Sequence, residues 1–230
     1  MYPVYGGRPE LYSTDMRNTI DVEALEKYLE QHHDYKYATV VHGDTPSGML
    51  NDVEQICPLL KKYGILTVTD AVSTCFGEAL DVEKAQIDIL CGGSQKVVSA
   101  PPGLTFVVVS RDARDAILNR KTPVASFYAN LSTFFHYYEE KWFPYTMPIS
   151  DIYGLRAAID NIAADKDIIR RHERIGKASR AAVKAAGLRL YQESGFSNTV
   201  TVFEVPEGTT DNEILETMKQ DYNIMLAGSF

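Results

Sequence analysis

Four short runs of apolar and β-branched residues, separated by helical patterns, organise the first half of the chain. The runs cover residues 37–41, 65–69, 87–91 and 104–109. Runs of this length with few polar breaks are typical of strands buried on both faces of a sheet. Apolar residues at helical spacing predict helices over 21–32, 52–63 and 111–119, and Ser110 is placed to cap the last of these. The alternation of strands and helices predicts a layered α/β sheet.

The spacing of apolar residues changes after residue 150. From Ile152 to Ala186 they step mostly by threes and fours, which predicts a long helix that breaks near residues 164–165. We interpret this helix as a connector between two domains, which gives predicted domains of 1–150 and 151–230.

The last fifty residues contain three further patterns. Alternation over 199–205 predicts a half-buried strand, residues 211–222 predict a helix, and 224–226 predict a strand that leads into a turn. A second sheet could not be completed from these elements. We therefore interpret the chain as part of a longer protein.

Composition and charge exclude several classes of protein. The 230 residues contain 23 Lys and Arg against 31 Asp and Glu, a formal net charge of −8, which argues against a general nucleic-acid binder. No apolar run approaches the roughly 20 residues that span a bilayer, and the first residues do not form a signal peptide. The three cysteines form no CxxC pair and are odd in number, so we expect reduced thiols and a cytoplasmic protein. No metal site is predicted.

Three polar clusters follow three successive predicted strands. They are HGDTPSG at 42–48, DAVS at 70–73 and GGSQK at 92–96. Because ligands of α/β sheets bind beyond the carboxyl ends of the strands, these clusters are expected to meet in one crevice.

Asp70 and Lys96 carry the chemistry of this crevice, and each has a plain alternative. Asp70 is either the N-cap of a following helix or a fixed anion that faces a bound cation. Lys96 could be a solvated surface charge, but its neighbours are small or apolar and no other formal charge lies between Asp88 and Arg111. We therefore predict a desolvated and nucleophilic amine. A nucleophilic lysine and a neighbouring carboxylate are the pair that pyridoxal 5′-phosphate (PLP) requires, since the lysine binds the aldehyde as a Schiff base and the carboxylate keeps the ring nitrogen protonated.

The sequence resembles the fold-type-I, class V aminotransferases of the alanine–glyoxylate or serine–pyruvate type. The matching stretches are HGDTPSG at 42–48, TDAVS at 69–73, GSQKVVSAPPG at 93–103 and YTMPISDIYGLRAAI at 145–159. The resemblance implies a three-layer large domain of the aspartate aminotransferase type, here incomplete, followed by part of a smaller α+β domain.

The resemblance also implies roles for six residues. Lys96 would form the Schiff base and move the substrate α-proton, and Asp70 would pair with the pyridinium nitrogen. Val72 would pack on the ring, and Thr45 would hydrogen-bond its phenolic oxygen.

Two further residues would hold the cofactor phosphate. Gln95 would contact it directly, and Thr146 would reach it from a neighbouring subunit, which implies a homodimer with composite active sites. Phe143 stands where similar enzymes often have a tyrosine that contacts the phosphate.

From the residues alone, plainer interpretations stay open for several of these positions. Val72 could be ordinary core, Thr45 could shape the turn before Pro46, and His42 could be a structural histidine. The chain also contains neither the Gly/Ser loop and stacking aromatic that precede these motifs in similar enzymes, nor their late arginine for the substrate carboxylate.

The predicted function is transfer of an amino group between a small amino acid, alanine or serine, and a 2-oxo acid, glyoxylate or pyruvate. One alternative is an inactive fragment of such an enzyme. Another is a PLP lyase or cysteine desulfurase on the same fold, which is disfavoured because a desulfurase needs a late cysteine and none follows Cys91.

Overall fold

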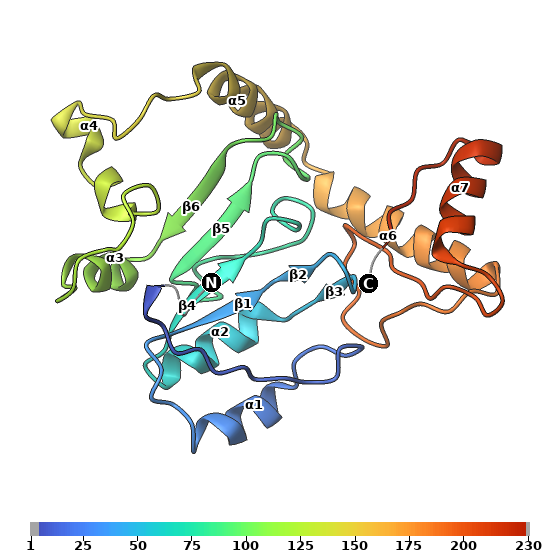
Figure 1. The fold of residues 1–230 in the computed structure, drawn as a ribbon, viewed down its shortest axis with the longest axis horizontal. Helices are drawn as coiled ribbons and strands as arrows, with labels where there is room; N and C mark the ends of the chain where they lie inside the picture. The colour runs from blue at the N-terminus through green and yellow to red at the C-terminus, as the bar shows by residue number, and fades with distance from the viewer. Residues whose placement is uncertain (1–4, 229–230) are drawn as a thin grey trace.

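The computed structural model describes residues 5–228 (Figure 1). The strands are β1 (Tyr37–Val41), β2 (Gly43–Asp44), β3 (Met49–Leu50), β4 (Leu66–Asp70), β5 (Ile89–Gly93) and β6 (Thr105–Val109). The helices are α1 (Val22–Leu29), α2 (Val53–Lys62), α3 (Arg111–Leu118), the 3₁₀ helix η2 (Leu131–Phe134), α4 (Tyr137–Glu140), α5 (Ile149–Ala164), α6 (Ile168–Ala185) and α7 (Asp211–Tyr222). The predicted α/β class is confirmed.

A four-stranded sheet of order β1-β4-β5-β6 forms the centre of the molecule. The first three strands are parallel, and β6 runs antiparallel to β5 at the edge. Val41 pairs with Asp70, and Asp70 pairs with Cys91. The carboxyl ends of β1, β4 and β5 therefore lie side by side, so the loops that follow them begin at one edge of the sheet.

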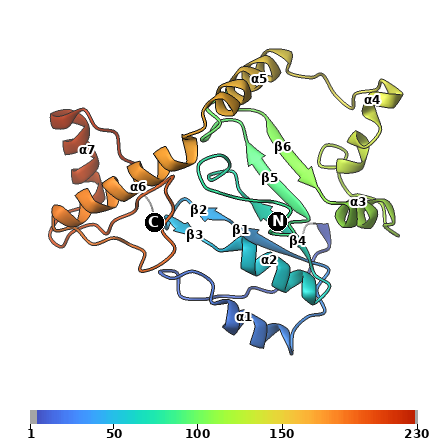
Figure 2. The ribbon, with the colours of Figure 1, turned by 180° about the vertical axis from the view of Figure 1, so that it is seen from behind.

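Only one face of this sheet is fully covered by the described residues. On the covered face Val40, Thr69 and Leu90 are buried, in a core to which α1 and α2 contribute Leu29 and Ile56. Burial of these apolar side chains stabilises the sheet by roughly 25 cal/mol per Å². In Figure 2 α2 lies beside β1 and β4, and α1 lies beyond α2.

The next row of side chains, on the opposite face, contains Val41, Asp70, Cys91 and Val107 in register. Val41 and Asp70 are exposed, and the other two are only partly buried. The prediction that all four strands are buried on both faces is therefore wrong for this chain. An α/β sheet needs a layer on each face, and the described residues cover only one.

The helix boundaries follow local signals in the sequence. Asp21 and Ser110 cap α1 and α3 through their side-chain oxygens, and Thr210 forms a capping box with Glu213 at the start of α7. The long predicted helix is two helices, with the break at residues 165–167. Pro58 lies inside α2 without ending it.

The predicted strand at 199–205 is not formed as a strand. Only one bridge joins Leu190 to Phe203, flanked by backbone hydrogen bonds from Tyr191 to Val202 and from Glu204 to Arg189. The apolar alternation is real, but its pairing partner is too short for a ladder. Residues 224–226 are also irregular, so that predicted strand is wrong as well.

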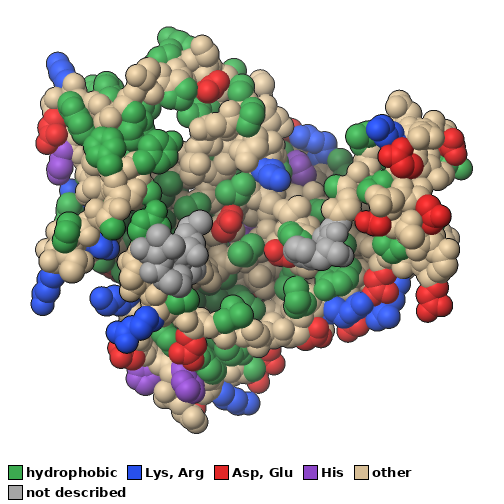
Figure 3. Space-filling model, in the orientation of Figure 1, with side chains coloured by type: hydrophobic (Ala, Val, Ile, Leu, Met, Phe, Trp, Pro, Cys, Tyr) green, Lys and Arg blue, Asp and Glu red, His purple; other side chains and the backbone are tan. Residues whose placement is uncertain are grey.

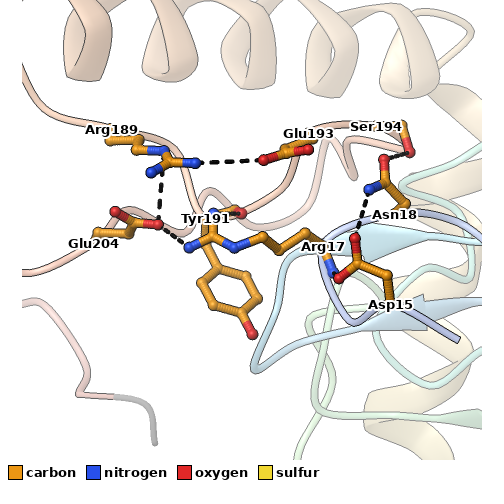
Figure 4. A network of polar contacts seen from close by, with 8 residues as sticks. All are labelled: Asp15, Arg17, Asn18, Arg189, Tyr191, Glu193, Ser194 and Glu204. Carbon is orange, nitrogen blue, oxygen red and sulfur yellow. Dashed lines mark hydrogen bonds and ion pairs between the residues drawn. The ribbon is translucent and has the colours of Figure 1, made fainter. Parts of the chain in front are cut away.

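The segment before α1 is attached to the C-terminal part of the chain (Figure 4). Arg17 forms an ion pair with Glu204, donates a hydrogen bond to the Tyr191 carbonyl at 2.8 Å and lies over the Tyr191 ring. Ser194 donates to Asn18 at 2.9 Å. Residues 15–19, which precede α1, thus hold the segment 189–204 against the N-terminal part of the chain. The domain boundary near residue 150 stays a prediction.

The chain exposes much more surface than a compact protein of its mass. Its accessible surface is 15373 Å², whereas a compact monomer of 25.7 kDa exposes about 10,000 Å². Figure 3 shows hydrophobic side chains on the segment around α4 and beside the hollow between that segment and the sheet. No helix in the described part of the chain is long and apolar enough to cross a membrane.

Candidate functional site

Backbone hydrogen bonds join the loops that follow β1, β4 and β5. The His42 amide donates to the Asp70 carbonyl at 2.8 Å, and the Ala71 amide donates to the Cys91 carbonyl at 2.9 Å. The Ser73 hydroxyl reaches the Gly43 carbonyl at 2.6 Å. The three polar clusters therefore form one continuous rim at the sheet edge, as expected from their position after the strands.

The loop that carries Thr45 is held by its own side chains. Asp44 accepts hydrogen bonds from the backbone amide of Ser47 at 2.9 Å and from its hydroxyl at 2.5 Å. The Gly48 amide closes the turn on the Asp44 carbonyl at 2.8 Å, with Gly48 at a φ of 76°. Thr45 is exposed at the tip of this turn, where its hydroxyl can meet a ligand.

Asp70 ends β4 with an exposed carboxylate. One carboxylate oxygen accepts the Val72 amide at 2.9 Å, which starts the helical turn over residues 71–77. The capping interpretation is correct only in part, because Asp70 caps a turn and no helix follows it in the described residues before β5. It does not exclude a role as a fixed anion, because a carboxylate has two oxygens that each accept more than one hydrogen bond.

Val72, Gln95 and Gly93 lie against one another. A Cβ added to Gly93 would lie 3.1 Å from Val72 Cγ1 and 2.8 Å from Gln95 Oε1. A side chain larger than glycine would therefore displace them, so an apolar side chain and an amide pack closely on the end of β5 at Gly93. Val72 is half-buried, and Gln95 is exposed.

Lys96 lies in a tight loop that Ser94 closes. The Ser94 hydroxyl donates to the Pro101 carbonyl at 2.6 Å, and the Ala100 amide donates to the Ser94 carbonyl at 2.9 Å. Lys96 itself is exposed, so the prediction of a desolvated lysine is wrong for this chain. Its neighbours in sequence are uncharged, but Gln95 and Ser99 are themselves exposed, and among residues 94–99 only Ser94 and Val98 are buried.

Thr146 is exposed in the segment between α4 and α5. Within residues 5–228 it makes no hydrogen bond or ion pair with the other candidates, which come from the three strand-end loops. The structure thus brings together the loops of Thr45, Asp70, Val72, Gln95 and Lys96, while Thr146 belongs to a separate part of the chain.

Comparisons with known proteins identify the family of this chain. The aminotransferase class-V family matches residues 6–228. The chain belongs to the class-V aminotransferases.

Two curated relatives and one solved structure illustrate the similarity. The chain is 36% identical to an uncharacterised aminotransferase of Methanocaldococcus jannaschii, over 97% of this chain and 59% of the relative. It is 34% identical to the serine–glyoxylate aminotransferase of Arabidopsis thaliana, over 94% of this chain and 56% of the relative. The crystal structure of ureidoglycine–glyoxylate aminotransferase from Bacillus subtilis superposes with a TM-score of 0.91 at 26% identity, covering 99% of this chain and 60% of that one. The chain thus spans less than two thirds of the length of these relatives.

Class-V aminotransferases of this fold use PLP, and the rim residues fit that cofactor chemically. A carboxylate suits a protonated ring nitrogen, an amine suits an aldehyde, and hydroxyl and amide groups suit the phenolic and phosphate oxygens. Val72, which packs at Gly93, is an apolar side chain that suits a ring face. The aspartate aminotransferase-like fold is confirmed, and it is incomplete in this chain.

Two thiols near Asp70 are unsuited to nucleophilic chemistry in this class-V aminotransferase. Burial, supported by the nearby Asp70 charge, raises the pKa of Cys75 to about 11. The same two causes raise the pKa of Cys91. Because their pKa values are raised, both thiols stay protonated near neutral pH. They are poor nucleophiles in this form, since the thiolate is the reactive species.

His42 is a structural residue of the rim. It is 4% exposed, and its Nδ1 lies 2.9 Å from the Thr74 hydroxyl. Thr74, which contacts His42, and Ser94, which closes the Lys96 loop, are not among the residues predicted from the sequence. Hydroxyl residues at strand ends are common, so neither position carried a signal that could distinguish it from an ordinary turn.

The pH dependence of stability reports on His42. Burial lowers its pKa, against an opposing effect of the Glu78 charge. As pH falls through about 6.5, His42 is protonated in the unfolded chain but stays neutral in the folded chain. Protonation therefore favours the unfolded chain, and the free energy of unfolding falls. We expect this loss between pH 7.5 and 5.5 in the wild type and its absence in His42→Asn, which keeps a polar atom near Thr74. Urea unfolding at several pH values measures it; equal pH profiles would contradict this role for His42.

Proposed function

We propose that this protein is a PLP-dependent aminotransferase whose site is the rim formed by the loops after β1, β4 and β5. The observation that carries the proposal is the junction at Gly93. There Val72 and Gln95 lie together beside the strand that ends in Asp70, and Lys96 follows Gln95 directly. One rim thus offers an anion for the ring nitrogen of PLP and an apolar side chain for its ring face. It also offers an amide for the phosphate and an amine for the aldehyde.

Each residue has a distinct task in this proposal. The Asp70 carboxylate accepts the ring N–H, Val72 packs on the ring, and Thr45 hydrogen-bonds the phenolic oxygen. Gln95 binds the phosphate. PLP supplies the electron-accepting ring, which stabilises the charge that develops at the substrate α-carbon.

Lys96 is the acid–base residue of this proposal. Its amine binds the cofactor aldehyde when no substrate is present. After substrate has entered, the free amine takes the proton from the substrate α-carbon and returns it later in the reaction, as a general base and then a general acid.

The proposed substrates are a small amino acid donor, alanine or serine, and a 2-oxo acid acceptor, glyoxylate or pyruvate. Glyoxylate is supported by the names of two relatives, the serine–glyoxylate and ureidoglycine–glyoxylate aminotransferases. These names describe those relatives, and on their basis we propose glyoxylate as the first acceptor to test with this protein.

Steady-state kinetics with two substrates test the proposal. With PLP, alanine and glyoxylate, we expect glycine and pyruvate in equal amounts and ping-pong kinetics, because the amino group is held by the enzyme between the two half-reactions. Release of sulfide and alanine from cysteine, without dependence on glyoxylate, would instead identify the desulfurase alternative.

A chain that keeps the fold without the activity is the second candidate. The exposure of Lys96 favours it, since an amine in bulk water lacks the desolvation that makes it a strong nucleophile at neutral pH. Absence of both half-reactions, in a sample that melts cooperatively, would support this candidate over the aminotransferase.

We further propose that the protein is a homodimer, joined through the segment 124–143. This segment exposes seven large apolar or aromatic side chains: Val124, Phe127, Tyr128, Tyr137, Tyr138, Trp142 and Phe143. Exposed aromatic residues in such number are typical of interfaces. Thr146 follows directly and would reach the phosphate in the second copy.

Charge placed in the segment 124–143 is expected to prevent dimerisation. We expect the wild type to sediment as a dimer and Trp142→Asp to sediment as a monomer, because an aspartate cannot be buried unpaired in an apolar interface. Tyr222→Asp is the matched control, since Tyr222 is also exposed but lies on α7. A wild type that is monomeric at all concentrations, or two variants that behave alike, would contradict the proposed interface.

A further inference from the structure

Glu78 is a buried carboxylate for which the proposed chemistry has no use. It is 5% exposed and lies eight residues after Asp70, just beyond the helical turn over 71–77. A buried charge is costly unless it is fully hydrogen-bonded, so its partners indicate what it does.

The hydrogen bonds that Glu78 accepts come from one distant loop. The Ser197 hydroxyl donates at 3.0 Å and the Asn198 side-chain amide at 2.9 Å, and the Asn198 backbone amide donates a third hydrogen bond. Arg180 on α6 holds the same loop from the other side, donating to the Ser197 carbonyl at 2.7 Å and to Asn198 Oδ1 at 3.0 Å. Asn198 thus bridges a buried anion and a half-buried cation.

The loop 195–199 also contacts the loop that carries Thr45. The Ser197 amide donates to the Gly48 carbonyl at 3.0 Å, and the Leu50 amide donates to the Gly195 carbonyl at 2.6 Å. Met49 and Phe196 form an antiparallel bridge. In Figure 1 the chain after α6 accordingly passes beside the ends of β2 and β3.

A third close contact of the loop 195–199 is at Gly77, where Val97, the residue after Lys96, also packs. A Cβ added to Gly77 would lie 2.5 Å from Thr199 Cγ2 and 2.9 Å from Val97 Cγ2, so these three residues pack closely. The loop 195–199 therefore contacts the loops that follow β1 and β4, and Val97, from the loop that follows β5, packs on the same glycine as Thr199.

We propose that Glu78 is a positioning residue: through the loop 195–199 it holds the three rim loops in one fixed arrangement. This role rests on the proposed function, because the three loops need a fixed arrangement if together they bind the cofactor. Because cofactor binding depends on groups from three separate strands, small displacements between their loops weaken every contact together. Glu78 contributes no atom to the cofactor and acts only through Ser197 and Asn198.

Hydrogen exchange at single-residue resolution tests this coupling without any cofactor. In Glu78→Ala we expect exchange to rise about tenfold or more at Asn198, which loses its acceptor, and also at Ser197, Leu50 and Gly48. Glu83→Ala is the matched control, because Glu83 is an exposed glutamate on the same segment. Glu78→Gln keeps one acceptor oxygen and should give intermediate exchange, which covers the case in which the alanine variant does not fold.

The outcomes separate this inference from the proposed function. Faster exchange confined to residues 197–199 would overturn it, since Glu78 would then act only locally. In a spectroscopic titration with PLP, we expect Glu78→Gln to bind about tenfold more weakly than the wild type. A wild type that binds no PLP contradicts the proposed function, while the exchange pattern still decides whether Glu78 couples the loops.

Discussion

Replacing Lys96 by arginine is expected to reduce amino transfer from alanine to glyoxylate by at least about a thousandfold. Arginine keeps the positive charge, so cofactor and substrate can still be attracted to the rim. Its guanidinium neither binds an aldehyde as an amine does nor gives up a proton near neutral pH. Formation of glycine, followed over time at saturating PLP, measures the loss.

Lys166→Arg is the control for this change. Lys166 is also exposed, but it lies between α5 and α6 in the segment 165–167. We expect it to retain the wild-type rate, which shows that the substitution itself is tolerated. A Lys96→Arg variant within about tenfold of the wild type would exclude Lys96 as the acid–base residue.

Replacing Asp88 by alanine is expected to lower the free energy of unfolding by about 2–3 kcal/mol. Asp88 is fully buried at the start of β5 and joins three elements. It accepts hydrogen bonds from the Thr67 amide at 3.0 Å, from Lys61 at 3.1 Å and from the Ser110 hydroxyl at 2.8 Å. Its removal leaves the buried Thr67 amide of β4 without an acceptor and removes a partner of Lys61 on α2 and of the partly buried Ser110, which caps α3. Urea unfolding followed by circular dichroism measures the effect.

The chain contains its own control for Asp88. Asp112 also pairs with Lys61, at 2.9 Å, but its side chain is 59% exposed. Because solvent screens exposed ion pairs, Asp112→Ala should change the free energy of unfolding by less than about 1 kcal/mol. Equal effects of the two substitutions would mean that the ion pair, and not the buried hydrogen bonds of Asp88, holds these elements together.

Local signals made much of the fold predictable. The helix over residues 211–222 has the predicted bounds because Thr210 and Glu213 form a capping box within the helix itself. The rim was predictable for a similar reason, since short apolar strands followed by polar residues fix which side chains reach the sheet edge.

Features that depend on distant contacts were not predictable. The burial of Lys96 was expected from its neutral neighbours, yet exposure is decided by what lies over a side chain in space. Glu78 looks like an ordinary surface glutamate in sequence, because its partner Asn198 is 120 residues away. The alternation at 199–205 identified an apolar segment correctly, but its pairing with residues 189–191 limits it to one bridge.

The central claim is that the amine of Lys96 and the carboxylate of Asp70 act on one bound PLP molecule. The most direct measurement is to incubate the chain with PLP, reduce it with borohydride and map the labelled peptides by mass spectrometry. We predict a single stable label on Lys96, strongly reduced in Asp70→Ala. A label spread over surface lysines such as Lys62 and Lys219, or one unaffected by the loss of Asp70, would contradict the claim.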